Sequence, residues 1–114
     1  MIFVIDENKM MAECIAKICG KNEVKVFGDA IAAMESLSGG LPDLIFMDVM
    51  LDGPDGFTFL NELVSYSDTM KIPVVLVTAL NFKKQDLSTY GVVGILDKDT
   101  MKPEEVRAYV EEYC

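Results

Sequence analysis

One apolar segment followed at once by an acid constrains the fold of this chain most. Leu44–Met47 is an unbroken apolar run, and Asp48 comes directly after it. Such a run is typical of a strand buried on both faces, as in a parallel sheet with helices on either side. A carboxylate at its end avoids the cost of burial only at the C-terminal edge of the sheet, where open α/β folds bind ligands. The segment therefore predicts an α/β fold with Asp48 at the ligand-binding edge.

Four further apolar runs have the length of strands, and helical patterns separate them. The expected strands are 2–5, 24–27, 44–47, 74–77 and 91–96. The expected helices are 9–19, 29–37, 57–64, 82–90 and 103–113, of which the fourth is short and weakly amphipathic. Strands that alternate with helices in this way form a parallel sheet with helices on both faces.

The order of the strands decides which residues meet. Right-handed crossovers leave few orders, and 2-1-3-4-5 is the common doubly wound order for five strands. In this order strands 1, 3, 4 and 5 are consecutive neighbours, so the residues at their C-terminal ends form one row. The row contains Asp6, Glu7, Asp48, Thr78, Ala79 and Lys98.

The row combines three carboxylates with a hydroxyl and an ammonium group. The carboxylates repel one another in a cleft and therefore require a cation. Oxygen ligands favour Mg²⁺, which takes one or two carboxylates and a phosphoryl oxygen. With the negative charge offset, Asp48 can attack phosphorus and form an aspartyl phosphate. Thr78 and the backbone N–H of Ala79 offer hydrogen bonds to the phosphoryl group, and Lys98 offers a positive charge. Each residue alone is more often a cap or a surface residue, so the prediction depends on their combination.

Length and composition exclude several classes of protein. With 114 residues, we expect one domain over 1–114. A net charge of −9 without histidine argues against electrostatic binding of nucleic acid. Since no apolar run approaches the roughly 20 residues of a membrane span and no signal peptide is evident, we expect a cytoplasmic protein without a membrane segment. Cys14, Cys19 and Cys114 lack zinc-ligand spacing and are expected to be reduced thiols.

The order and type of these residues resemble the receiver domain of two-component response regulators. The segments 47–50 and 55–57 are similar to the family's phosphoacceptor motif, and Asp6 with Glu7 is similar to its acidic pair. The resemblance implies a stand-alone domain of the chemotaxis-regulator type with a flavodoxin-like fold. It also implies an Mg²⁺ site whose ligands are Asp6, Glu7, Asp48 and the carbonyl of Met50.

The remaining site residues extend the resemblance and imply a function. Thr78, Ala79 and Lys98 match the hydroxyl, the small residue and the lysine of the family. The resemblance implies that the chain is not an enzyme but a phosphoacceptor in a phosphorelay. A histidine kinase or a histidine phosphotransfer protein would phosphorylate Asp48, and the affinity for a downstream protein would then change.

Several residues depart from the family's pattern. Glu7 stands where the family usually has aspartate, and Ile95 stands where it has the switch aromatic. Asp99 replaces the proline that normally follows the lysine in a cis bond. Because a cis non-proline bond costs about 3 kcal/mol, the Lys98–Asp99 bond is either trans with a rearranged loop or strained. Asp97 and Asp99 could also compete for the charge of Lys98.

These departures favour one alternative, and two other α/β classes fit less well. The alternative is a receiver-like scaffold that binds partners without phosphorylation. A phosphatase of the haloacid dehalogenase type needs a second aspartate two residues after the first, where this chain has Asn8. A flavin binder needs a loop rich in serine, threonine and glycine, whereas Asp6 and Glu7 would repel its phosphate. P-loop and G-x-G-x-x-G motifs are absent from the sequence.

Overall fold

A single parallel sheet of five strands forms the centre of the computed structural model, which describes residues 1–48, 56–78 and 90–114. The strand order is β2-β1-β3-β4-β5, so the predicted doubly wound topology is confirmed. The strands are β1 (Ile2–Ile5), β2 (Val24–Phe27), β3 (Leu44–Met47), β4 (Val74–Thr78) and β5 (Val92–Asp97). β4 is one residue longer than expected, and β5 begins and ends one residue later.

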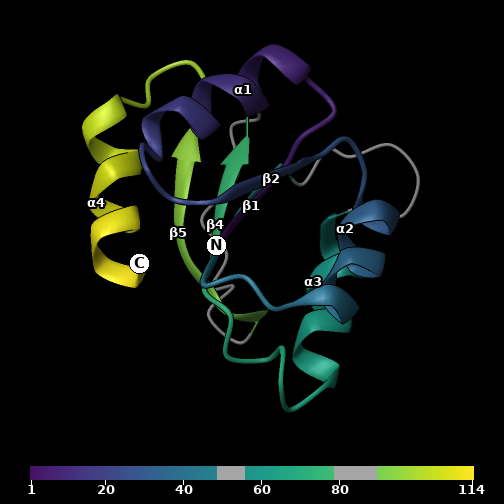
Figure 1. The fold of residues 1–114 in the computed structure, drawn as a ribbon. Coiled ribbons are helices and arrows are strands. Elements are labelled where there is room, and N and C mark those ends of the chain that lie inside the picture. Colours follow the sequence, from purple (N-terminus) through teal and green to yellow (C-terminus); the bar gives the residue numbers. More distant parts are fainter. Residues whose placement is uncertain (49–55, 79–89) are drawn as a thin grey trace.

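Helices cover both faces of the sheet, as Figure 1 shows. They are α1 (Lys9–Ile18), α2 (Ala30–Ser36), α3 (Gly56–Ser65) and α4 (Pro103–Tyr113), with a 3₁₀ turn η1 at Leu37–Gly39. α1 and α4 pack on one face, and α2 and α3 on the other. The predicted helix at 82–90 lies outside the described residues except for Tyr90.

Short polar residues fix where the first two helices begin. The side chain of Asn8 accepts a hydrogen bond from the N–H of Met11 at 3.2 Å and caps α1, as its position before the helical pattern predicts. Asp29 accepts from the N–H of Ala32 at 2.8 Å and caps α2. Both caps lie at the C-terminal edge of the sheet, so they also fix the chain near the predicted row of site residues.

Successive residues of the central strands point into two separate cores. Phe3, Ile5, Ile45 and Met47 pack with α2 and α3, whereas Ile2, Val4, Leu44 and Phe46 pack with α1 and α4. All eight residues are at most 1% exposed. β1 and β3 are therefore buried on both faces, which explains why their sequences are unbroken apolar runs. Within 1–48, 56–78 and 90–114, no helix combines the length and the apolar character of a transmembrane span.

Candidate functional site

Backbone hydrogen bonds hold three predicted site residues at the C-terminal edge of the sheet. The N–H of Asp6 donates to the last residue of β2, and the N–H of Asp48 donates to the last residue of β1, both at 3.0 Å. The N–H of Lys98 donates to the last residue of β4, also at 3.0 Å. Each bond continues the pairing of the sheet by one residue. The sheet itself therefore sets the backbone positions of these residues.

Lys98 joins the two acids that these strands carry. Its Nζ atom lies 2.7 Å from Oδ2 of Asp48 and 2.8 Å from Oδ2 of Asp6. Asp48 is 6% exposed and Asp6 is 3% exposed. Two nearly buried carboxylates that contact the same ammonium group repel each other, and that ammonium group offsets the repulsion. The structure thus brings together an acid from strand 1, an acid from strand 3 and the lysine after strand 5.

The surroundings of Lys98 keep it charged. Burial acts to lower the pKa of Lys98, but the hydrogen bond from its ammonium group to Asp48, the ion pair with Asp6 and the charges of these acids outweigh burial and raise this pKa above its ordinary value. Lys98 therefore carries a positive charge at neutral pH. A fixed cation beside a buried carboxylate is suited to a site that handles anionic groups.

The loop after Lys98 adopts the first of the two conformations that the sequence left open. The Lys98–Asp99 bond is trans, since the described part of the chain contains no cis peptide bond. The N–H of Asp99 donates to Oδ1 of Asp97 at 2.8 Å, and both aspartates are exposed. The ammonium group of Lys98 pairs instead with the two buried acids.

The carboxylate oxygens of Asp6 are suited to bind a divalent cation. Oδ1 of Asp6 accepts a hydrogen bond from the N–H of Asn8 at 2.8 Å. Oδ2 is buried and forms the ion pair with Lys98, but within 1–48, 56–78 and 90–114 no group donates a hydrogen bond of good geometry to it. A buried carboxylate oxygen that lacks a hydrogen-bond donor is a position where an ion or a water would bind. The carboxylates of Asp6 and Asp48 are hard oxygen donors, and Mg²⁺ commonly uses one or two of these.

The other predicted metal ligands contribute differently. Glu7 is exposed and directly follows Asp6. No group of three His, Cys, Asp or Glu side chains is gathered as for a metal among the described residues. Among the described residues, the carboxylates of Asp6 and Asp48 therefore converge as possible metal ligands, and Glu7 is adjacent to Asp6 in the sequence. Met50, a predicted carbonyl ligand, lies outside the described residues.

Thr78 occupies the edge between the acid and the lysine. It is the last residue of β4, is 1% exposed and pairs with Asp97 of β5. Since β4 lies between β3 and β5, Thr78 lies between the strands that lead to Asp48 and Lys98. Ala79, predicted to donate its backbone N–H, lies outside the described residues.

One structural contribution was not anticipated. The N–H of Asn8 orients the carboxylate of Asp6, while the side chain of Asn8 caps α1. The sequence signal for this arrangement is an aspartate two residues before a helix cap, because Asp accepts hydrogen bonds from the backbone two residues on. Asn8 thus couples the position of the acid to the start of a helix.

Comparisons with known proteins agree with this geometry. The response regulator receiver domain family matches residues 2–111. The chain is 28% identical over 105 residues to a protein-glutamate methylesterase/protein-glutamine glutaminase 3 of Leptospira interrogans, and the match covers 85% of this chain. It covers only 29% of that relative, so the chain spans less than a third of its length.

Solved structures show the same fold. The chemotaxis response regulator CheY4 of Vibrio cholerae superposes with a TM-score of 0.85 at 20% identity, covering 99% of this chain and 97% of that one. The receiver domain of the sensor histidine kinase PA1611 of Pseudomonas aeruginosa PAO1 gives a TM-score of 0.81 at 22% identity, covering 98% and 94%. That structure contains a magnesium ion coordinated in its active site cleft.

Proposed function

The chain belongs to the family of response regulator receiver domains, and from this membership we propose that it accepts a phosphoryl group on Asp48. The observation that carries the proposal is the contact of Lys98 with Asp48 and Asp6, at 2.7 and 2.8 Å. It supports the proposal because phosphoryl transfer requires a positioned nucleophile with positive charge beside it. Phosphorylation then changes the affinity of the domain for a partner protein.

In the proposed reaction the carboxylate of Asp48 is the nucleophile. One of its oxygens bonds to the phosphorus of a phosphohistidine while the phosphorus–nitrogen bond breaks, and the electron pair stays with the departing imidazole. Lys98 stays protonated and pairs with a phosphoryl oxygen. The hydroxyl of Thr78 and the backbone N–H of Ala79 are further donors. Mg²⁺, when bound, supplies positive charge that offsets the phosphoryl oxygens, and its proposed ligands are Asp6, Glu7, Asp48 and the carbonyl of Met50.

The proposed change in partner affinity depends on which groups pair with the ammonium group of Lys98. In the described state its ammonium group is shared by Asp6 and Asp48. A phosphoryl group on Asp48 adds almost two negative charges and competes for the same cation. The conformation in which Lys98 and Thr78 both reach the phosphoryl group is then favoured over the described one, and a partner that binds it better gains affinity.

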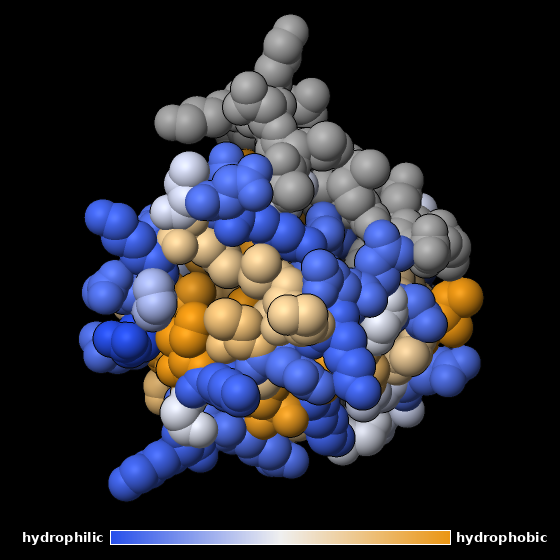
Figure 2. Space-filling view, turned by 90° about the horizontal axis from the view of Figure 1, so that it is seen from above, coloured by the Kyte–Doolittle hydropathy of each residue, from blue (hydrophilic) through white to orange (hydrophobic). Residues whose placement is uncertain are grey.

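The donor binds where Asp48 can be reached. Met10 lies in the first turn of α1, four residues after Asp6, and is 82% exposed. Figure 2 looks onto the end of the molecule where α1 lies, and apolar surface is exposed there among mostly hydrophilic side chains. This surface suits a histidine kinase or a histidine phosphotransfer protein. We assign the exchange to one receiver domain, residues 1–114, in the cytoplasm.

One observation favours the alternative function, a receiver-like scaffold that binds partners without phosphorylation. The family's switch aromatic is replaced by Ile95, which lies on β5 and is 36% exposed. An aliphatic side chain cannot reproduce the coupling of a rotating ring to Thr78. A domain that binds its partner equally well with and without phosphate on Asp48 would have this property.

The test is phosphorylation by a small donor. The protein is incubated with Mg²⁺ and acetyl phosphate, and the intact mass of the parent chain, Asp48→Asn and the surface control Asp68→Asn is measured. We expect one added phosphoryl group on the parent and the control and none on Asp48→Asn. An unchanged mass of the parent with both acetyl phosphate and phosphoramidate would contradict the proposal and favour the scaffold.

A further inference from the structure

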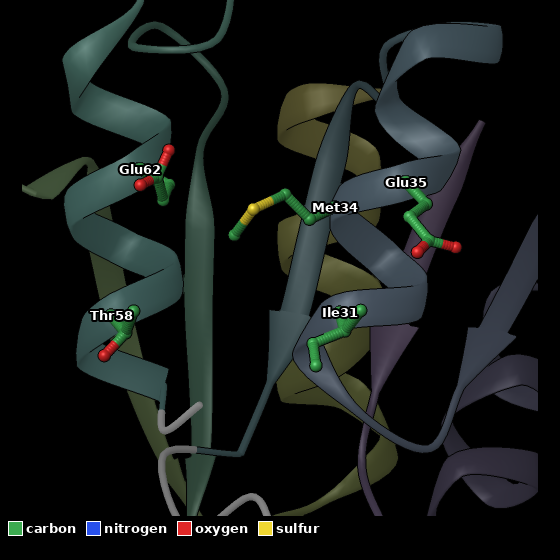
Figure 3. A pocket seen from close by; sticks show the side chains of 5 residues that line it. All are labelled: Ile31, Met34, Glu35, Thr58 and Glu62. Atoms are coloured by element: carbon green, nitrogen blue, oxygen red, sulfur yellow. The ribbon is translucent and has the colours of Figure 1, made fainter. Parts of the chain in front are cut away.

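A groove between α2 and α3 lies apart from the residues proposed for phosphorylation. Its volume is about 430 Å³, within the range of ligand sites. Five side chains line it, namely Ile31, Met34, Glu35, Thr58 and Glu62. Figure 3 shows Met34 extending from α2 into the space between the two helices, with Thr58 and Glu62 on the facing helix.

The apolar side chains of the groove are accessible to a partner. Ile31 is 51% exposed, although it belongs to a helix whose opposite side is buried at Ala30 and Ala33. Met34 is partly buried and packs against the core between the sheet and the two helices. Methionine is unbranched and flexible, and it adapts to the shape of an incoming apolar group. Ile31 and Met34 together therefore form a deformable apolar floor.

The negative charge of the groove favours a partner with basic residues. Glu35 on α2 and Glu62 on α3 are both exposed and stand on opposite sides of the floor. In the part of the chain that the structure describes, neither forms an ion pair with a lysine or arginine. The groove thus offers an apolar centre between two negative charges, in a protein whose net charge is −9.

The shape favours a helix over a small molecule. A small-ligand site fixes its ligand with several convergent hydrogen-bonding groups, whereas the two carboxylates here flank an open groove between two helices. An amphipathic helix binds such a groove with apolar residues at helical spacing. Basic residues on the two flanks of its apolar face would reach the two glutamates, which stand on opposite sides of the groove.

We propose that the groove between α2 and α3 is a docking site for a basic amphipathic helix of a partner protein. An apolar side chain of that helix inserts between Ile31 and Met34, and flanking lysines or arginines pair with Glu35 and Glu62. The groove contains neither Asp48 nor Lys98, so this docking does not require phosphorylation. It gives the domain a second surface for protein contacts.

The test uses a defined peptide as probe. A short labelled peptide of leucine and lysine in an amphipathic helical pattern is titrated into ¹⁵N-labelled protein, and amide shifts and fluorescence anisotropy are followed. We expect the largest shifts on α2 and α3 and weaker binding at high salt. Ile31→Ser should lower the affinity about tenfold, and Glu35→Gln with Glu62→Gln should lower it severalfold and flatten the salt dependence. Asp48→Asn should bind as the parent does.

Matched variants separate the groove from general attraction to an acidic protein. Leu41→Ser removes a similarly exposed aliphatic side chain outside the groove, and Glu111→Gln with Glu112→Gln removes the same charge from α4. Equal losses of affinity in these controls would overturn the proposal. Binding of tetrabutylammonium in the groove without binding of the peptide would also overturn it. Because Asp48→Asn is tested in parallel, these outcomes do not depend on whether Asp48 is phosphorylated.

Discussion

Lys98 bridges two acids that would otherwise repel each other at the edge of the sheet. Its reach to both Asp6 and Asp48 depends on side-chain geometry, which no sequence pattern contains. The sequence does predict the row in which these residues stand, because each follows an apolar run that ends at the same edge. The row could therefore be predicted, but the shared ion pair could not.

Removing this cation should make the domain depend on divalent metal. Lys98→Met keeps the length of the side chain but leaves two nearly buried carboxylates without their ammonium partner, which costs about 3 kcal/mol at neutral pH. Mg²⁺ should then stabilise the variant more than it stabilises the parent. Urea unfolding with Mg²⁺ and with EDTA measures both effects. Lys102→Met, at an exposed position, should show neither. An equal Mg²⁺ effect in Lys98→Met and the parent would argue against a metal site at these acids.

The buried thiol of Cys19 should make the stability of the fold depend on pH. Cys19 is 2% exposed, and burial raises the pKa of its thiol from 9.0 to about 11. Below pH 9 the thiol is protonated in the folded and unfolded states alike. Between pH 9 and 11 the unfolded state loses this proton more readily, so the free energy of unfolding should fall by about 3 kcal/mol at most.

The variant Cys19→Ala isolates this contribution. Its free energy of unfolding should fall less steeply between pH 9 and 11 than that of the parent, with both measured by urea unfolding under reducing conditions. Cys14→Ala, at an exposed position, should retain the steeper fall of the parent. Parallel curves for Cys19→Ala and the parent would show that this thiol does not link stability to pH.

At the scale of elements, β5 and α4 meet through a glycine and a tyrosine. A Cβ atom placed on Gly94 would overlap the hydroxyl oxygen of Tyr109 and lie 2.5 Å from the nearest atom of its ring. Tyr109 and Tyr113 both pack against the core shared by α1 and α4. Both tyrosines therefore have a packing role.

The close approach at Gly94 predicts a specific loss of stability. Gly94→Ala should displace the ring of Tyr109 and destabilise the fold by about 1–3 kcal/mol. Gly94→Ala combined with Tyr109→Leu should cost less than the sum of the two single changes, because the clash is then relieved. Thermal unfolding of the four proteins measures this coupling. A Cβ atom on Gly39 would have no atom within 4 Å, so Gly39→Ala should leave the stability of the fold nearly unchanged. Strict additivity would contradict the packing of Tyr109 over Gly94.

The elements themselves were largely predictable, and the exceptions have physical causes. Within the residues that the structure describes, apolar runs and helix caps determine four helices and five strands, within one or two residues at most ends. The register between β4 and β5 could not be predicted, because it shifts between Val74 and Val75 and leaves Val93 without a partner there. Such a bulge depends on packing across the sheet rather than on strand propensity. It turns Gly94 toward α4, where Tyr109 lies.

At the scale of the whole molecule, the doubly wound topology gathers residues from distant segments at one end. Asp6, Asp48 and Lys98 are separated by roughly 40 to 50 residues along the chain. Parallel pairing places β1 next to β3, and β4 joins β3 to β5, so the three residues reach the same edge of the sheet. The groove between α2 and α3 is a product of the same topology, because both helices cover one face of the sheet. The proposed phosphorylation and the proposed helix docking would therefore use separate surfaces of the chain.

The encounter with a phosphodonor protein should depend on apolar surface that the chemistry itself does not need. Met10→Ser removes a highly exposed side chain near Asp6 without touching Asp48 or Lys98. Transfer from a phosphorylated histidine phosphotransfer protein should slow about fivefold to tenfold, as expected for an interface residue worth about 1 kcal/mol. Phosphorylation by acetyl phosphate should keep its rate, because a small donor needs no docking surface. Met70→Ser removes a methionine that is 50% exposed and should leave both rates unchanged. Since the two donors share the same reacting carboxylate, a loss of rate with the protein donor alone locates the effect in recognition. Equal slowing with both donors would instead place Met10 within the structure of the site.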